Sequence, residues 1–385
     1  MAITLGNENI PFKIIEGKRI GVLAHPASLD SNGNHILDKL KGMKVNIATI
    51  FGPEHGFKGF AQDMEGVNND VTDDGISIFS LYGNTLESLT PTEKMLSEID
   101  TLIVDLQDIG SRYYTYAWTA VLCIRACAKY NKEIIICDRP NPLGGVTIEG
   151  NGIEIGFESF VGLHSVSVRH GMTIGEIAEY VNKTEELNAN LTVIPMKGWK
   201  RKQLWKETEL NWTNPSPNMR SFEAALLYPG MCLLEATNMS EGRGTPAPFE
   251  ITGAPYVNST ELIEALKKHG LEGVTIDSIA FKPLSNKWEN ETCQGIRWRI
   301  TDSEKLEPYS LGLIYIYTLY HLYRDKGFSW RDAPYEFVTD KPAIDLLTGS
   351  DYFRNNIEMI THDEIQKLCK PSDEFLKTRN KFLLY

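Results

Sequence analysis

The sequence lacks the long apolar run that a membrane-spanning helix requires, since no stretch approaches about 20 consecutive apolar residues. Its start, MAITLGNENIPFKIIEGKRI, also lacks the charged and then apolar pattern of a signal peptide. We therefore expect a cytoplasmic chain, or a periplasmic or secreted one if a signal segment has been removed. Basic residues are too few to outweigh acidic ones, with 39 Lys and Arg against 51 Asp and Glu and a formal net charge of −12. Because nucleic acids and anionic membranes are bound through clustered Lys and Arg, we expect neither as a partner.

Cysteines are few and form no CxxC pair. Six occur, and Cys123 and Cys127 lie four apart in a helical pattern while Cys137 lies in an apolar run. This spacing favours buried free thiols over a disulfide framework or a metal site. No HExxH motif and no regular His and Cys spacing is present, so we expect no metal ion.

Several nucleotide and hydrolase motifs are also absent. The first apolar run continues as GVLAHPAS, without the GxGxxG turn of a dinucleotide-binding fold. No GxxxxGK[ST] phosphate loop occurs, and no GxSxG turn carries a nucleophilic serine. These absences argue against nucleotide cofactors and α/β-hydrolase chemistry, and we expect no cofactor.

In the first half of the chain, short apolar runs alternate with helical patterns. The runs are 19–24, 45–51, 76–82, 101–106, 133–138 and 191–196, and the helical patterns are 33–42, 91–99, 117–131 and 173–183. Continuously apolar runs are typical of parallel strands buried on both faces. We therefore predict a Rossmann-like, doubly wound, mostly parallel sheet. Thr90, Pro91 and Glu93 predict a capping box at the second helix.

Residues 198–258 differ, because they are rich in Pro, Gly, Asn and Trp, a composition typical of functional or interdomain loops. Beyond them the pattern predicts a helix at 259–269, strands near 274–281 and 295–301, a long helix at 309–325 and a helical tail. We predict two domains, a Rossmann-like catalytic domain at 1–255 and a smaller α/β domain at 256–385.

Polar side chains follow three of the predicted strands where each strand ends. They are Glu54 and His55, then Gln107, Asp108, Arg112 and Tyr113, and then Asp138, Arg139 and Asn141. Ligands of open parallel sheets bind beyond the carboxyl ends of the strands, so we expect a site there. Carboxylates with amide, Arg and aromatic companions are typical of glycoside hydrolysis. The plainer alternatives are that Asp138 caps a helix, Arg112 neutralises Asp108, and Glu54 with His55 forms a surface loop.

Two further segments carry candidates whose role the residues alone leave open. His170 in VRHGMTIGE is either a structural histidine before a helix or a substrate contact. In TNMSEGRGTPAPFE, at 237–250, Glu241 and Arg243 flank a glycine. They either pair in a solvent-facing loop or close over the sheet edge, and we predict that this loop belongs to the active site.

Seven motifs occur here in one order: FGPEHGF, DLQDIGSRYYTY, DRPNPLGG, VRHGMTIGE, PSPNM, YPG and TNMSEGRGT-x-x-PFE. In them the chain resembles the exo-β-N-acetylmuramidase NamZ family, glycoside hydrolase family 171, once known only as domain of unknown function 1343. The resemblance runs from about residue 19 to the terminal FLLY. It implies a Rossmann-like domain, a smaller α/β domain and a cleft between them. It also implies release of terminal N-acetylmuramic acid from the non-reducing end of peptidoglycan fragments.

The resemblance extends to single residues. The glutamate of the PEHG motif, Glu54, corresponds to the family's catalytic candidate. Where the family reads AQAGE this chain reads AQDMEG, so Glu65 keeps the acidic position while the residues before it differ. Asn218 of PSPNM and Asn238 of TNM join the expected sugar-binding residues.

We predict an exo-acting β-N-acetylmuramidase that acts on peptidoglycan-derived disaccharides or muropeptides. Glu54 is the predicted general acid, and Glu241, Glu65 and Asp138 compete for the second catalytic role. Arg112, Arg139 and Arg243 are candidates to pair with the lactyl carboxylate of muramic acid. The alternatives are a cell-wall amidase or esterase, and a muropeptide-binding protein without catalysis.

Overall fold

The N-terminal part of the chain is built on a seven-stranded sheet. The computed structural model describes residues 2–332 and 334–385. The strands are β1 (Arg19–Ala24), β2 (Asn46–Gly52), β3 (Asp70–Val71), β4 (Ser77–Ser80), β5 (Thr101–Asp105), β6 (Glu133–Cys137) and β7 (Asn190–Ile194). Their order is β3-β4-β2-β1-β5-β6-β7. We call this part, with the helices and loops around its sheet, the N-terminal unit.

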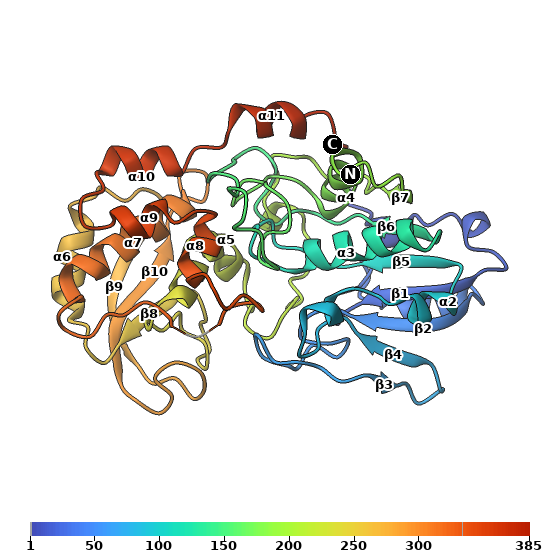
Figure 1. Ribbon diagram of the computed structural model, residues 1–385, viewed down its shortest axis with the longest axis horizontal. Coiled ribbons are helices and arrows are strands. Elements are labelled where there is room, and N and C mark those ends of the chain that lie inside the picture. Colours follow the sequence, from blue (N-terminus) through green and yellow to red (C-terminus); the bar gives the residue numbers. More distant parts are fainter. Residues whose placement is uncertain (1, 333) are drawn as a thin grey trace.

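All neighbouring strands of this sheet are parallel except β3, which pairs antiparallel with β4. Without β3, the strands stand in the order third, second, first, fourth, fifth, sixth along the chain, which confirms the predicted doubly wound fold. The direction of winding reverses between β1 and β5, where Val22 is in register with Ile103. The strands point toward the other half of the molecule (Figure 1).

The flanking helices are α1 (Ile36–Gly42), α2 (Glu93–Ser97), α3 (Tyr116–Lys129) and α4 (Ile174–Thr184), and the short 3-10 helices are η1 (Gly6–Glu8), η2 (Phe12–Ile14), η3 (Leu86–Leu89) and η4 (Trp205–Glu207). The capping box predicted at Thr90 is wrong. Thr90 ends η3 with an extended backbone, and the cap of α2 is Thr92, whose side chain accepts a hydrogen bond from Met95 N. Pro91 therefore precedes the helix instead of opening it.

The C-terminal unit is built on a smaller antiparallel sheet of order β8-β10-β9. Its strands are β8 (Ile251–Ala254), β9 (Val274–Phe281) and β10 (Cys293–Ile300), and its helices are α5 (Phe222–Met231), η5 (Cys232–Ala236), α6 (Ser259–Lys267), α7 (Pro308–Tyr323), α8 (Ala343–Thr348), α9 (Tyr352–Asn356) and α10 (His362–Leu368). A second, smaller α/β unit is thereby confirmed. Its predicted boundary near residue 255 stays a prediction.

The loop-rich interpretation of 198–258 was wrong for its middle, because α5 is a regular helix there. Its N-cap is Ser221, whose side chain accepts a hydrogen bond from Ala224 N. Nearly every residue of α5 is buried, so the helix shows no polar face for a sequence pattern to reveal. A Cβ on Gly230 would lie 2.0 Å from the Pro308 carbonyl oxygen, and one on Gly312 would lie 2.5 Å from Gly230 Cα. Helices α5 and α7 therefore touch backbone to backbone.

After α10 the chain returns to the N-terminal unit through α11 (Asp373–Arg379), which bridges the two units (Figure 1). The Arg379 guanidinium donates to the carbonyl oxygens of His170, Gly145 and Gly171. The Tyr385 hydroxyl donates to Asp138 Oδ2 at 2.7 Å. One apolar cluster also extends from β5 to α7, so the two units share a core.

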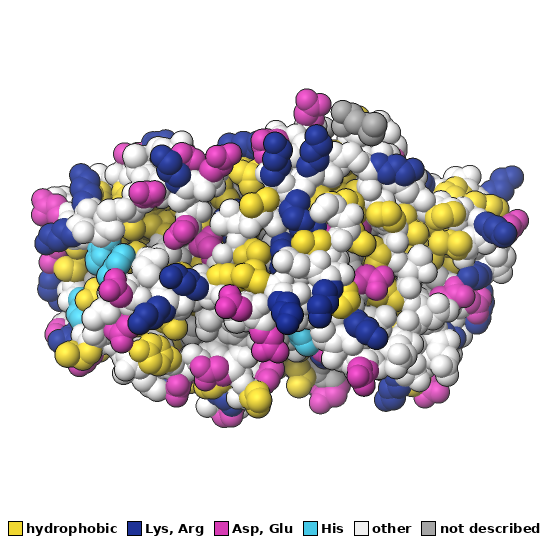
Figure 2. Space-filling view, turned by 90° about the horizontal axis from the view of Figure 1, so that it is seen from above, with side chains coloured by type: hydrophobic (Ala, Val, Ile, Leu, Met, Phe, Trp, Pro, Cys, Tyr) yellow, Lys and Arg dark blue, Asp and Glu magenta, His cyan; other side chains and the backbone are white. Residues whose placement is uncertain are grey.

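The structure also shows where the charged side chains and the cysteines lie. On the face that carries α11, Lys and Arg side chains gather across the middle of the molecule (Figure 2), although the chain as a whole is acidic. All six cysteines are buried free thiols, as expected. Among the residues that the structure describes, no helix has the length and apolar character needed to cross a bilayer.

Candidate active site

A pocket lies where the carboxyl ends of the large sheet meet the C-terminal unit, and we call it the carboxylate pocket. The N-terminal unit contributes Glu54, His55, Asp63, Tyr113, Tyr114 and Thr115, and the C-terminal unit contributes Tyr228, Glu235, Arg243, Phe249, Tyr335 and Glu336. The loop before α5 adds Ser216, Asn218 and Met219. Of the residues predicted from the sequence, the structure brings together Glu54, His55, Tyr113, Asn218 and Arg243 here.

Glu54 reaches the pocket because the chain turns back sharply after β2. A Cβ on Gly52 would lie 2.4 Å from Phe57 N, so only glycine allows this close return. The Glu54 side chain is 5 % exposed. Its Oε2 accepts a hydrogen bond from Thr115 Oγ1 at 2.6 Å, and its Oε1 accepts one from Met64 N at 3.4 Å. Hydrogen bonds donated to both oxygens hold the Glu54 side chain in one orientation.

His55 is held in the same turn with its backbone in the left-handed region, at φ +69°. Such a backbone is strained for a residue with a side chain and persists where the surroundings enforce it. Here the Nδ1–H donates to the Ala61 carbonyl oxygen at 2.8 Å. In the neutral ring this leaves Nε2 as a hydrogen-bond acceptor for a ligand.

Glu336 is a pocket residue that the sequence analysis missed. It lies in a tight turn closed by a bridge between Tyr335 and Val338, with positive φ at Glu336 and Phe337. Its Oε2 accepts a hydrogen bond from the Tyr82 hydroxyl at 3.0 Å. Burial, and next the negative charge of Glu54, raise the pKa of Glu336 well above its usual range. Glu336 follows no predicted strand and lies in none of the seven motifs, so neither pattern indicates it.

Arg243 holds three carboxylates together at one side of the pocket. Its Nη1 lies 3.2 Å from Asp63 Oδ1, its Nε lies 3.0 Å from Glu241 Oε1, and its Nη2 contacts Glu235. These carboxylates keep the pKa of Arg243 high although its burial opposes the charge. The predicted pairing of Glu241 with Arg243 is thus present, within a buried network instead of a solvent-facing loop.

Glu241 has little freedom within this network. Its second oxygen, Oε2, lies 2.9 Å from Lys287 Nζ, and Lys287 also donates to the carbonyl oxygens of Leu234 and Met239. Both oxygens of Glu241 therefore face cations. Glu65, in contrast, is exposed outside the pocket, where its carboxylate accepts a hydrogen bond from Gln62 N at 2.9 Å.

The residues after β6 lie away from the carboxylate pocket. Asp138 accepts hydrogen bonds from Thr173 Oγ1 and Gly175 N, both at 2.8 Å, so it fixes the start of α4. Asn141 donates to the Met172 carbonyl oxygen at 2.9 Å. Both arrangements match the plainer interpretation of this strand end as a structural turn.

The residues after β5 divide between the pocket and the core. Tyr113 lines the pocket, whereas the Gln107 amide donates to the carbonyl oxygens of Asp108 and Pro140. Burial raises the pKa of Asp108 to about 7. Its Oδ2 lies 3.8 Å from His170 Nε2, and burial lowers the pKa of His170 to about 3. Asp108 and His170 are thus a buried pair outside the pocket, and the structure does not pair Arg112 with Asp108.

The three arginines predicted to read the lactyl carboxylate are all engaged by the protein. Arg112 donates to the carbonyl oxygens of Asn151, Val166 and Leu347. Arg139 forms a bidentate ion pair with Asp105 at 2.6 and 2.8 Å, and Arg243 holds its three carboxylates.

Two asparagines from the motifs have different surroundings. Asn218 Nδ2 donates to Gln62 Oε1 at 3.1 Å, which leaves the Asn218 carbonyl oxygen beside the pocket. Asn238 lies outside the pocket lining, where its Nδ2 donates to the Gly327 carbonyl oxygen and its Oδ1 accepts from the Tyr256 hydroxyl. Asn238 thus stabilises the C-terminal unit.

The place where the sheet reverses its winding, between β1 and β5, holds a second group of polar residues. We call Asn7, His25, Ser28, Asp105 and Arg139 the switch-point cluster. Asn7 Nδ2 donates to Asp105 Oδ2 at 3.0 Å, and Gln107 N donates to His25 Nε2 at 3.0 Å. Burial, and then the charge of Arg139, lower the pKa of His25 to about 3. The segment that carries η1 thus lies in the crevice in which related folds bind ligands, and Leu5, Gln107 and Arg139 line a small pocket that remains beside it.

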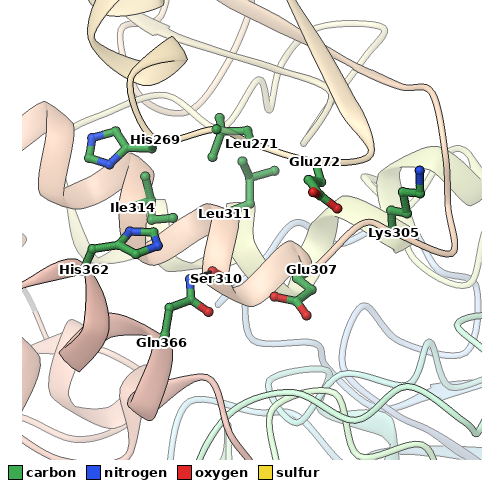
Figure 3. A pocket seen from close by; sticks show the side chains of 11 residues that line it. His269, Leu271, Glu272, Lys305, Glu307, Ser310, Leu311, Ile314, His362 and Gln366 are labelled. Carbon is green, nitrogen blue, oxygen red and sulfur yellow. Dashed lines mark hydrogen bonds between the residues drawn. The ribbon is translucent and has the colours of Figure 1, made fainter.

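Another pocket lies in the C-terminal unit between α6, α7 and α10 (Figure 3). His269 and His362 approach each other there with ring centroids 6.3 Å apart, and Glu272, Lys305 and Glu307 lie at the opposite side of the pocket (Figure 3). Across the described parts of the chain, no group of three or more His, Cys, Asp or Glu side chains is arranged to hold a metal ion. None of the predicted site residues lies in this pocket.

Comparison with known proteins covers the whole chain. A family model for the N-terminal domain of the exo-β-N-acetylmuramidase NamZ matches residues 20–223, and one for the C-terminal domain matches residues 226–385. The chain is 39 % identical over 377 residues to the peptidoglycan β-N-acetylmuramidase NamZ of Bacillus subtilis (strain 168), which covers 97 % of this chain and 88 % of that protein. Two crystal structures of DUF1343 family proteins from Bacteroides fragilis resemble it, with TM-scores of 0.87 and 0.76 at 33 % and 30 % identity. Each alignment covers 100 % of this chain and 99 % of the other.

Proposed function

The chain belongs to the exo-β-N-acetylmuramidase NamZ family, and from this premise we propose how its own residues carry out the reaction. It is a glycoside hydrolase, a peptidoglycan β-N-acetylmuramidase that releases N-acetylmuramic acid from the non-reducing end of peptidoglycan fragments. The bond that breaks joins C1 of this sugar to the oxygen of the next one. Cleavage requires a proton for that oxygen and negative charge to stabilise C1 as positive charge develops there.

Glu54 is the carboxyl group that we place at the centre of this reaction. The supporting observation is its position, buried at the carboxyl end of β2 in a pocket that both units line. A carboxylate surrounded by protein interacts with developing charge more strongly than one in water. The two hydrogen bonds from Thr115 and Met64 orient it before a substrate arrives.

Glu241, the runner-up among the predicted catalytic residues, is better suited to an indirect role. Its two oxygens are bound by Arg243 and Lys287, so neither is free to accept a proton from water. We propose that Glu241 positions Arg243, which in turn fixes Asp63 and Glu235 along one wall. The exposed carboxylate of Glu65 then shapes the loop 61–65 through its hydrogen bond to Gln62 N.

Sugar recognition falls to polar groups that the protein leaves available in the pocket. His55 presents Nε2 and Asn218 presents its side-chain oxygen, and both accept hydrogen bonds from sugar hydroxyl or amide groups. The aromatic rings of Tyr228 and Phe249 pack edge to face with centroids 4.9 Å apart and supply an apolar wall. We propose that the terminal sugar binds between these groups.

The test is hydrolysis of 4-nitrophenyl β-N-acetylmuramide and of the natural disaccharide of N-acetylmuramic acid and N-acetylglucosamine. We expect release of free N-acetylmuramic acid from both, and much slower release of N-acetylglucosamine from its own 4-nitrophenyl glycoside. Release of a peptide with the sugar bond intact would support an amidase instead. Binding without turnover would support a muropeptide-binding protein and contradict the proposal.

A further inference from the structure

Two carboxyl groups from opposite units meet in the carboxylate pocket. Glu54 follows β2 of the large sheet, whereas Glu336 lies in the turn that precedes α8 of the C-terminal unit. Both side chains are buried. After burial, the negative charge of Glu54 does most to raise the pKa of Glu336. Two neighbouring buried carboxyls resist being ionised together, so one of them retains a proton.

The surroundings decide which of the two keeps the proton. Glu54 accepts hydrogen bonds at both oxygens, from a hydroxyl and from a backbone N–H. Glu336 accepts one, from Tyr82, and none of the described residues donates to its Oε1. Donors thus hold both oxygens of Glu54, whereas burial and the nearby charges of Glu54 and Glu235 raise the pKa of Glu336, which is therefore the group that keeps the proton.

We propose that Glu336 is the proton donor of the reaction and that Glu54 is its ionised partner. This assignment rests on the proposed function, and it moves the acid role that the sequence suggested for Glu54 to a residue of the other unit. The left-handed backbone of Glu336 and Phe337 agrees with it, because strained turns persist where a side chain must be held in one place.

The step balances without any additional reagent. The Glu336 proton moves to the glycosidic oxygen as the C1–O bond breaks, and the electron pair of that bond stays with the leaving sugar. The Glu54 carboxylate stabilises the positive charge at C1. Water then supplies the hydroxyl group at C1, and the proton that this water loses returns the Glu336 carboxyl to its acid form.

The experiment compares Glu336→Gln and Glu54→Gln on two substrates whose leaving groups differ. A 4-nitrophenolate leaves without protonation, whereas the sugar alcohol of the natural disaccharide needs a proton. We expect Glu336→Gln to lose roughly 10²–10⁴-fold in kcat on the disaccharide but less than about 10-fold on the 4-nitrophenyl glycoside. Glu54→Gln should lose activity on both substrates.

Glu149→Gln is the matched control, because Glu149 is also a buried carboxyl with a raised pKa, about 7, but lies outside the pocket, paired with Arg169. This variant should not change the ratio of kcat on the disaccharide to kcat on the 4-nitrophenyl glycoside. If Glu336→Gln loses equal activity on both substrates, or no activity on the disaccharide, the proton-donor role is overturned.

If Glu336→Gln fails to fold, the pH profiles of the wild-type enzyme on the two substrates decide. The proposal then requires the disaccharide rate to fall at high pH where the 4-nitrophenyl rate persists, and parallel profiles would refute it. Wild-type enzyme inactive on both substrates would instead refute the proposed function.

A second, independent observation concerns the lactyl carboxylate that distinguishes muramic acid from glucosamine. Arg331 is a half-buried arginine without an ion pair among the residues that the structure describes. Its guanidinium carbon lies 5.4 Å from the ring centroid of Tyr335, which lines the pocket. Its Nη2 lies 3.6 Å from the sulfur of Met64, the residue whose N–H binds Glu54.

We infer that Arg331 pairs with the carboxylate of the lactyl group. The pocket holds the carboxylates of Glu54, Asp63 and Glu235, and its one lining arginine, Arg243, is already paired with the last two, so an anionic substrate needs a further cation. A guanidinium stacked on Tyr335 is pre-oriented and suits bidentate binding of a carboxylate.

Arg331→Met should raise KM for 4-nitrophenyl β-N-acetylmuramide about 10–100-fold and leave KM for the glucosaminyl analogue nearly unchanged. Arg331→Lys should recover part of the loss. The matched control is Arg299→Met, because Arg299 is an exposed arginine paired with Asp277 on the small sheet. Unchanged KM for the muramyl substrate, or an equal rise for both substrates, would refute the inference.

Discussion

The carboxylate pocket and the switch-point cluster both place charged side chains beyond the ends of parallel strands, yet their charges are balanced differently. In the switch-point cluster each charge has its partner, since Asp105 is bound by Arg139 and Asn7. In the carboxylate pocket neither Glu54 nor Glu336 forms an ion pair with a described residue, and Arg243, which also lines the pocket, is shared among three other acids. A buried site stabilises the fold when its charges are paired, and it can do chemistry when some are left unpaired.

The same contrast concerns the place at which we propose that the substrate binds. Doubly wound sheets commonly bind ligands at the switch point, but here the segment before β1 occupies it. A Cβ on Gly6 would lie 2.3 Å from Asp138 N, so this segment fits tightly against the sheet. The site that we propose lies toward β2 instead, where residues of the C-terminal unit complete the pocket lining.

The largest expected effect would test the chemical side of this comparison. Glu54→Gln keeps the size of the side chain but removes its charge, so kcat should fall roughly 10²–10⁴-fold. Thermal melting should stay nearly unchanged, because the folded structure loses no ion pair at Glu54. Kinetics and melting should be measured on the same preparation. Near-normal turnover would exclude Glu54 from the reaction.

The structural side is tested by Arg139→Met. Removing one partner of a buried ion pair leaves Asp105 unpaired and should lower the free energy of unfolding by about 3–5 kcal/mol. Denaturant unfolding measures this loss. The folded fraction should keep its kcat, because Arg139 does not line the carboxylate pocket. A variant of normal stability and poor turnover would place Arg139 in the active site instead.

The pH dependence of protein stability tests the role of His25 in the switch-point cluster. An unfolded histidine takes up a proton near pH 6.5, whereas buried His25 resists protonation until about pH 3. Its contribution to stability is therefore complete above pH 6.5 and is lost as the pH falls toward 3, by about 2 kcal/mol between pH 7 and pH 5. His25→Gln should lose correspondingly less stability over this range in denaturant unfolding. The same pH dependence in variant and wild type would contradict the assignment.

The smallest effect is expected for Glu241, which is paired with two cations, one of which lines the carboxylate pocket. Glu241→Gln should lower kcat only about 10-fold, because Arg243 keeps Asp63 and Glu235 as partners. Glu289→Gln, an exposed change on the loop that carries Lys287, is the control and should alter nothing. Unchanged kinetics of Glu241→Gln would contradict its role in positioning Arg243.

The sheet and one carboxylate of the site could be predicted because their signals are local. The strands are continuously apolar, and Glu54 follows one of them directly. Asp138 likewise follows a buried apolar strand, β6, but turns toward α4 instead, and the apolar pattern of the two strands does not distinguish the two cases. Glu235 and Glu336 reach the pocket only through packing between distant segments. Helix α5 escaped prediction because a helix buried on every side has no periodic face.

The returning segment with α11 also limits how the molecule can move. The chain crosses between the units twice, once before α5 and again through α11 (Figure 1). A rigid body attached to another at two points can rotate only about the line that joins them. Arg112, which donates to the Leu347 carbonyl oxygen, and Glu149, which accepts from Tyr309 N, fasten the units at further points inside. These attachments oppose even that rotation, so the two units are held as one frame on either side of the carboxylate pocket.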